Sequence, residues 1–116
     1  MCFAVRVVVV APTRERRLAL RRAAVSAEWE VVGDAEDPGE ALDRATALRA
    51  RFVVLDAAAA GSGGAELATG LRDLRPRAFL VGVGGVDAAD AQVPDDLGGL
   101  RDVMAGLLHD SGDHAH

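Results

Sequence analysis

The feature that most constrains the fold of this sequence is a regular alternation of short apolar runs with helix-like segments. Four runs have the length and composition of β-strands: residues 3–11, 29–35, 51–56 and 78–83. The first, FAVRVVVVA, is almost continuously apolar and β-branched, which is typical of a strand buried on both faces of a parallel sheet. Segments with helical apolar spacing separate the runs. The order therefore predicts an α/β domain with helices crossing over a parallel sheet.

Local capping signals indicate where the first two helices begin. Thr13 offers an N-cap before a helix over residues 14–27. The motif Asp37-Pro38-Gly39-Glu40 combines a capping carboxylate, a proline at the first helical position and a glutamate three residues after the cap. We expect this second helix to run to about Ala50.

The remaining segments complete a doubly wound domain. We expect a flexible loop over residues 57–64, a helix over 65–74, a loop over 84–94 and a last helix over 95–108. Val93 reads as the remnant of a fifth strand. Right-handed crossovers then give a flavodoxin-like parallel sheet with strand order 2-1-3-4-5. Residues 1–108 form one domain in this interpretation, and residues 109–116 form a flexible C-terminal tail.

Charge is unevenly distributed along a chain whose net charge is −5. Residues 1–27 contain six Arg and one Glu, whereas residues 86–116 contain seven Asp and one Arg. An acidic chain is a poor general binder of nucleic acid, so we expect no direct nucleic-acid partner. The polarity favours head-to-tail contact between copies, or charge complementarity within the fold.

Several classes of function lack the residues they need. The single cysteine, Cys2, cannot form an internal disulfide, which favours a reducing, cytoplasmic compartment. The longest apolar run is far shorter than the roughly 20 residues of a membrane span. All three histidines lie in residues 109–116, so no serine has a nearby base and no fixed metal geometry is indicated. We therefore expect no enzyme activity, no cofactor, no metal and no membrane contact.

Three segments together resemble the receiver domains of bacterial response regulators, particularly those attached to helix-turn-helix transcription factors. They are VRVVVVAPTRERRLALRR, VVGDAEDPGEAL and FVVLDAAAAGSGGAEL. The resemblance covers residues 5 to about 85 well and the last helix loosely. Asp56 falls on the phosphoacceptor aspartate of the family, and Gly61 and Gly64 fall on its loop glycines.

The resemblance also implies a set of chemical groups, most of which are missing here. A receiver forms an acyl phosphate on its aspartate, while two acidic residues at the end of strand one hold Mg²⁺. These two positions fall on Ala11 and Pro12. The phosphoryl-binding hydroxyl falls on Gly84, or on Gly82 in a shifted register, and the phosphoryl-binding lysine is absent because the chain has no Lys. Asp56 alone remains, so the sequence indicates a degenerate pseudo-receiver.

Further departures complete this interpretation. The Met-Pro that follows the acceptor in the family is Ala59-Ala60 here, and the segment after strand four is too short for the family's fourth helix. We therefore expect that helix to be shortened or absent, which would uncover part of the sheet or of the last helix. The leading hypothesis is a phosphorylation-independent signalling and protein-interaction module that regulates transcription or an ATPase partner.

Two alternatives use the same edge of the sheet differently. The first is a true receiver phosphorylated at Asp56 with an altered metal site, for which Asp34, Glu36 and Asp37 could supply a carboxylate. The second is a small-ligand sensor with a crevice near Asp34, Asp56 and Gly84.

The predicted first helix carries the candidate partner surface. Leu18 and Val25 lie seven residues apart on the same side, among basic residues that include Arg14, Arg17 and Arg21. A solvated outer face would have the same composition, because arginine stems cover apolar surface. The surface would suit a protein partner or a homodimer.

Overall fold

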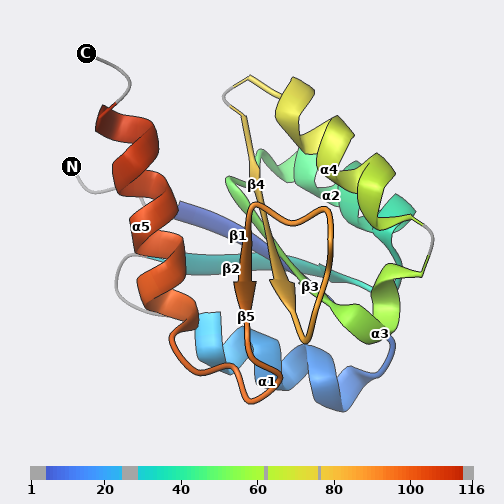
Figure 1. The fold of residues 1–116 in the computed structure, drawn as a ribbon. Coiled ribbons are helices and arrows are strands. Elements are labelled where there is room, and N and C mark those ends of the chain that lie inside the picture. Colours follow the sequence, from blue (N-terminus) through green and yellow to red (C-terminus); the bar gives the residue numbers. More distant parts are fainter. Residues whose placement is uncertain (1–4, 25–28, 62, 76, 114–116) are drawn as a thin grey trace.

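Five parallel strands form one sheet in the computed structural model, which describes residues 5–24, 29–61, 63–75 and 77–113 (Figure 1). Their order across the sheet is β2-β1-β3-β4-β5. The strands are β1 (Val5–Val10), β2 (Trp29–Ala35), β3 (Phe52–Asp56), β4 (Phe79–Val83) and β5 (Ala91–Val93). This order confirms the predicted flavodoxin-like fold, and the expected remnant at Val93 is a short fifth strand.

Helices cover both faces of the sheet. They are α1 (Arg14–Ala24), α2 (Pro38–Leu48), α3 (Ala57–Ala60), α4 (Gly64–Asp73) and α5 (Leu100–Asp113). Helices α1 and α5 lie on one face, whereas α2 and α4 lie on the other (Figure 1). In the part of the chain that is described, no helix is both long enough and apolar enough to cross a bilayer.

Alternate residues of the strands build two separate apolar cores. Val7 and Val9 of β1 contribute to the core under α1 and α5, while Val8 and Val10 contribute to the core under α2 and α4. All four are fully buried, because successive strand side chains point to opposite faces and both faces are covered. This explains why the residues from Val7 to Val10 are all apolar.

The predicted start of α2 is confirmed. The backbone of Asp37 is extended, and its Oδ1 accepts a hydrogen bond from the Glu40 amide at 2.9 Å. Pro38 occupies the first helical turn. The helix ends at Leu48, slightly before the expected Ala50, because Arg49 takes a left-handed conformation with φ 55°.

Two helix boundaries differ from the sequence prediction. Residues 57–60, expected to be part of a flexible loop, form the short helix α3, which Asp56 caps. The last helix begins at Leu100 rather than at residue 95, because Leu97 and Gly99 have φ values of 67° and 79° that no α-helix accommodates. It continues to Asp113, into the segment predicted as a tail; residues 114–116 lie outside the described part.

Residues 84–90, which join β4 to β5, contain no helix, as the sequence predicted. The expected uncovering of the sheet does not follow, because this loop folds back over β4 and buries Val86. The Gln92 side chain holds the loop by accepting a hydrogen bond from the Val86 amide and donating one to the Val86 carbonyl. A Cβ on Gly82 would lie 2.6 Å from the Cβ of Val86, so only glycine permits this close approach.

A carboxylate fastens the other end of the same loop. Asp90 accepts hydrogen bonds from the Leu80 amide at 2.8 Å and from Nη2 of Arg77 at 2.7 Å. The loop therefore covers the α2 and α4 face of the sheet beside β4, where Leu80 packs in the same core as Val86 and remains fully buried.

Candidate functional site

The candidate site lies at the carboxyl edge of the sheet, where β3 ends at Asp56. This residue is only 6% exposed, and it is the buried charged residue of the described core. Its Oδ1 faces the Ala58 amide at a long 3.5 Å, and its Oδ2 accepts a hydrogen bond from Nε of Arg16 at 3.2 Å. Burying a carboxylate is costly unless a cation accompanies it, and Arg16 supplies that cation.

Arg16 joins three parts of the fold that are distant in sequence. The residue lies in the first turns of α1, where its amide donates to the Thr13 hydroxyl at 3.2 Å. Its Nη2 donates to the Asp95 carbonyl at 2.8 Å and to the Asp95 Oδ1 at 2.9 Å. We call this arrangement of Arg16 with Asp56 and Asp95 the Arg16 bridge. A planar guanidinium can bind both aspartates at once, because its N–H donors point in different, fixed directions.

A second guanidinium, that of Arg17, lies at the carboxyl ends of β1 and β2. Arg17 donates from Nη1 to the Ala11 carbonyl at 3.0 Å, and its Nε lies 3.5 Å from Oδ2 of Asp34. Its Nη2 lies 3.9 Å from Oε1 of Glu36. The sequence predicts Arg17 as part of the partner surface, but its side chain is only 15% exposed and contacts Ala11, Asp34 and Glu36 at the ends of β1 and β2.

The positions that the family resemblance assigns to a metal and a phosphoryl group, Ala11, Pro12 and Gly84, carry no side-chain oxygen or lysine nitrogen. Ala11 is fully buried and offers only its carbonyl, which Arg17 already engages. Gly84 follows β4 with φ 82°, and a Cβ there would lie 3.4 Å from Oδ1 of Asp95 and 3.7 Å from Cβ of Ala57. Among the described residues, no cluster of three His, Cys, Asp or Glu side chains could hold a metal ion.

The predicted crevice of Asp34, Asp56 and Gly84 is thus divided between two arginines. Gly84 lies beside the Arg16 bridge, because a Cβ added to it would come within van der Waals distance of Asp95. Asp34 is held separately by Arg17. Sequence reasoning missed Arg16 and Asp95. The signal that could have found them is the need of a buried aspartate for a compensating cation once the lysine and the metal ligands are gone.

Three residues of the predicted partner surface, Arg14, Leu18 and Arg21, lie on α1. Arg14 and Arg21 are exposed there, and Leu18 is 41% exposed, the highest value for a large apolar side chain in the described part of the chain. Val25 lies outside the described residues.

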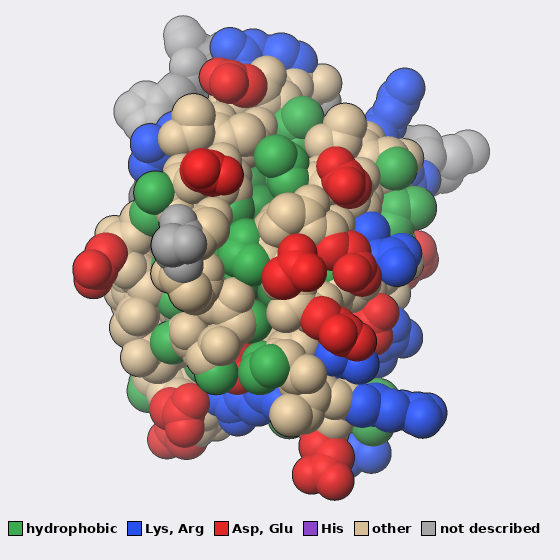
Figure 2. All heavy atoms as spheres, turned by 90° about the vertical axis from the view of Figure 1, so that its right-hand side faces the viewer, with side chains coloured by type: hydrophobic (Ala, Val, Ile, Leu, Met, Phe, Trp, Pro, Cys, Tyr) green, Lys and Arg blue, Asp and Glu red, His purple; other side chains and the backbone are tan. Residues whose placement is uncertain are grey.

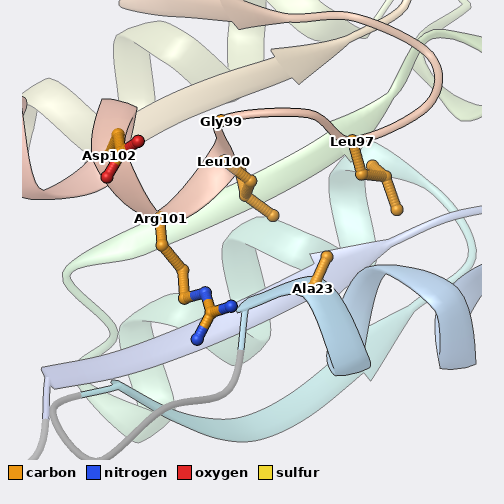
Figure 3. Close-up of a pocket in the computed structure, with 6 residues that line it drawn as sticks. All are labelled: Ala23, Leu97, Gly99, Leu100, Arg101 and Asp102. Carbon is orange, nitrogen blue, oxygen red and sulfur yellow. The ribbon is translucent and has the colours of Figure 1, made fainter.

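The described surface has two further features, a groove beside α1 and an apolar strip over α2 and α4. A groove of about 450 Å³ separates α1 from the start of α5 (Figure 3). On the opposite side of the molecule, over α2 and α4, apolar side chains form a strip with acidic side chains gathered beside it (Figure 2). Carboxylates lining the hollows of these two helices include Glu40, Asp43, Glu66 and Asp73.

Comparison with known proteins relies on structure, because no protein-family model and no curated protein sequence matches this chain. A LuxR-family two-component response regulator from Aurantimonas superposes with a TM-score of 0.76 at 22% identity, covering 92% of this chain and 86% of that one. The signal receiver domain of NarL from Mycobacterium tuberculosis gives 0.74 at 26% identity, covering 94% and 98%.

A third match supports the same fold. The REC domain of AraT, a response regulator from Geobacillus stearothermophilus, gives a TM-score of 0.75 at 21% identity, covering 98% of this chain and 100% of that one. These similarities agree with the strand order β2-β1-β3-β4-β5. The chain therefore has the fold of response-regulator receiver domains, and Arg16 pairs with Asp56 at the end of its β3.

Proposed function

We propose that this chain is a cytoplasmic, phosphorylation-independent, receiver-like module that signals by binding another protein. The observation that carries the proposal is the ion pair between Arg16 and the buried Asp56. A receiver aspartate must be free to attack phosphorus, and a divalent cation must offset the negative charge that gathers as the phosphoryl group arrives. Here a side chain of the protein itself takes the cation's place beside the carboxylate.

The residues around the pair also disfavour phosphoryl transfer. Arg16 is shared between Asp56 and Asp95, so its charge is already balanced by two carboxylates. Ala11 and Pro12 have no side-chain oxygen to bind Mg²⁺, and the chain contains no lysine to receive the phosphoryl oxygens. An acyl phosphate at Asp56 would have to break the Arg16 bridge without a replacement.

The outer face of α1 is our proposed binding surface. Leu18 supplies exposed apolar area, and Arg14 and Arg21 flank it at helical spacing. The matching partner is a protein with acidic residues around an apolar site, such as a transcription factor, an ATPase or a second copy of this chain. The exposed leucine and the acidic net charge argue against a nucleic-acid backbone as the ligand.

Acetyl phosphate with Mg²⁺ tests the absence of phosphorylation directly. Intact-mass spectrometry of the purified chain should show no added phosphoryl group, while a phosphorylatable receiver in the same reaction gains one. Beryllofluoride with Mg²⁺ should likewise leave the melting temperature unchanged. A mass gain of one phosphoryl group that disappears in Asp56→Asn but persists in Asp34→Asn would overturn the proposal in favour of a true receiver.

Self-association is tested separately. Light scattering at high micromolar concentration should show a dimer that Leu18→Asp dissociates, whereas Arg72→Glu on α4 should leave it intact. A monomer at that concentration would exclude the homodimer and leave only a different protein as the partner. A melting-temperature increase with nucleotides or acyl compounds would instead favour the small-ligand sensor.

A further inference from the structure

The turn between β5 and α5 has a conformation that its own sequence does not favour. Leu97 has φ 67°, in the left-handed region where a side chain with a Cβ is strained. The bonds within the turn are short-range: the Leu97 amide donates to the Pro94 carbonyl at 2.8 Å, the Gly98 amide donates to Oδ1 of Asp96 at 2.9 Å, and the Leu100 amide donates to the Leu97 carbonyl at 3.4 Å. Strained conformations persist where surrounding contacts over-determine them.

The Arg16 bridge supplies those surrounding contacts. Nη2 of Arg16 donates hydrogen bonds to both the carbonyl and the carboxylate of Asp95, which directly precedes the strained turn. The Asp95 side chain is 82% exposed, so it has little packing of its own to hold it. The other end of the bridge is the buried Asp56 at the end of β3. A rigid strand end is thus connected to an exposed turn through one guanidinium.

The position of this turn determines the shape of the groove between α1 and α5. Leu97 and Leu100 extend from the turn and the start of α5 toward Ala23 of α1, with Arg101 beside them (Figure 3). Leu97 is half-buried against the core below, whereas Leu100 is buried. Release of residues 94–97 would therefore move one wall of the groove.

We propose that Arg16 is a positioning residue that holds the β5–α5 turn, and with it the α1–α5 groove, permanently in one conformation. This inference rests on the proposed function, because it requires that Asp56 pair with Arg16 rather than carry a phosphoryl group. The bridge then links the acceptor position to the α5 side of the molecule without any modification. The surface presented on that side does not depend on a signal delivered to Asp56.

Hydrogen exchange of individual amides tests the proposal. The amide of Val54, in the centre of the sheet, serves as the reference for global destabilisation. In Arg16→Met, exchange at the amides of Leu97 and Gly98 should rise about tenfold or more beyond the rise at Val54. The matched control is Arg17→Met, which removes the neighbouring guanidinium at the same edge but touches no residue of the turn. It should leave exchange at Leu97 and Gly98, relative to that at Val54, unchanged.

A second variant keeps the test decisive if Arg16→Met does not fold. Asp95→Ala removes the exposed carboxylate while the Arg16–Asp56 pair remains, so the melting temperature should stay near that of the wild type. Exchange at Leu97 and Gly98 should still rise by about threefold or more. The positioning role would be overturned if, in the variants that fold, exchange at Leu97 and Gly98 rose no more than exchange at Val54. Neither result involves phosphorylation, so the mass-spectrometric test of the proposed function stays independent.

Discussion

Replacing Arg16 by methionine removes the guanidinium but keeps most of the apolar stem of the side chain. The variant leaves the Asp56 carboxylate, whose side chain is 8% exposed, with only the long 3.5 Å contact to the Ala58 amide. Asp95 loses less, because its carboxylate is 82% exposed and water can hydrate it. The cost of the substitution therefore falls mainly on Asp56.

The magnitude follows from the burial of the two partners. Removing one member of a fully buried ion pair costs about 3 to 5 kcal/mol, because the remaining charge has no compensation. The Arg16 side chain is 25% exposed, so some water can reach the carboxylate once the guanidinium is gone. We therefore expect Arg16→Met to lower the free energy of unfolding by about 2 to 3 kcal/mol.

A double-mutant cycle isolates the pair itself. Asp56→Asn removes the charge but retains the shape, so the double variant should be less destabilised than the sum of the single changes by about 1 to 2 kcal/mol. Urea unfolding followed by the fluorescence of Trp29, the single tryptophan, supplies the measurement, since Trp29 is buried against Phe52. With a urea slope of about 1 to 3 kcal/mol per molar, the midpoint of Arg16→Met should fall by roughly 0.7 to 3 M.

Arg44→Met provides the control for the general effect of losing an arginine. Its partner Glu40 lies one helical turn away, and both side chains are more than two-fifths exposed. This change should cost only about 0.3 kcal/mol. A structural role for the Arg16–Asp56 pair would be refuted if Arg16→Met unfolded at the same urea concentration as Arg44→Met, or if the cycle were additive.

Three further substitutions test local features of the fold by the same urea titration. Gly82→Ala should destabilise by about 2 kcal/mol, because its Cβ would lie 2.6 Å from Cβ of Val86; an unchanged midpoint would mean that the loop after β4 yields easily. Asp37→Ala should cost about 1 kcal/mol through loss of the bond to the Glu40 amide, and a stabilised variant would contradict the capping role. Arg49→Gly should raise stability by about 0.5 kcal/mol, because glycine accepts the left-handed backbone that ends α2; a lower midpoint would show that the side chain matters more than the strain.

The sequence alone determined the features that depend on neighbouring residues or on chain length. Burial on both faces makes β1 and β3 almost continuously apolar, so the strands and their parallel order could be predicted. The hydrogen bond that the Glu40 amide donates to Asp37 joins residues only three apart, so the cap could be predicted. The segment between β4 and β5 is too short for a helix, and this too could be read from the chain length. The absence of oxygen ligands at Ala11 and Pro12 needed no structure at all.

Only the tertiary structure decided which arginine occupies the site. Arg14, Arg16, Arg17 and Arg21 are chemically identical and share one helix, so composition and spacing cannot rank them. The contacts of Arg16 span 40 residues to Asp56 and 79 residues to Asp95, and they exist because α1 packs on the sheet at one rotation and one height. The left-handed Leu97 is likewise imposed from outside its own segment. Sequence patterns such as caps and helical pairs involve residues within about one helical turn of each other. The cation that compensates a buried carboxylate can be distant in sequence, so only the packing of the whole fold decides which side chain supplies it.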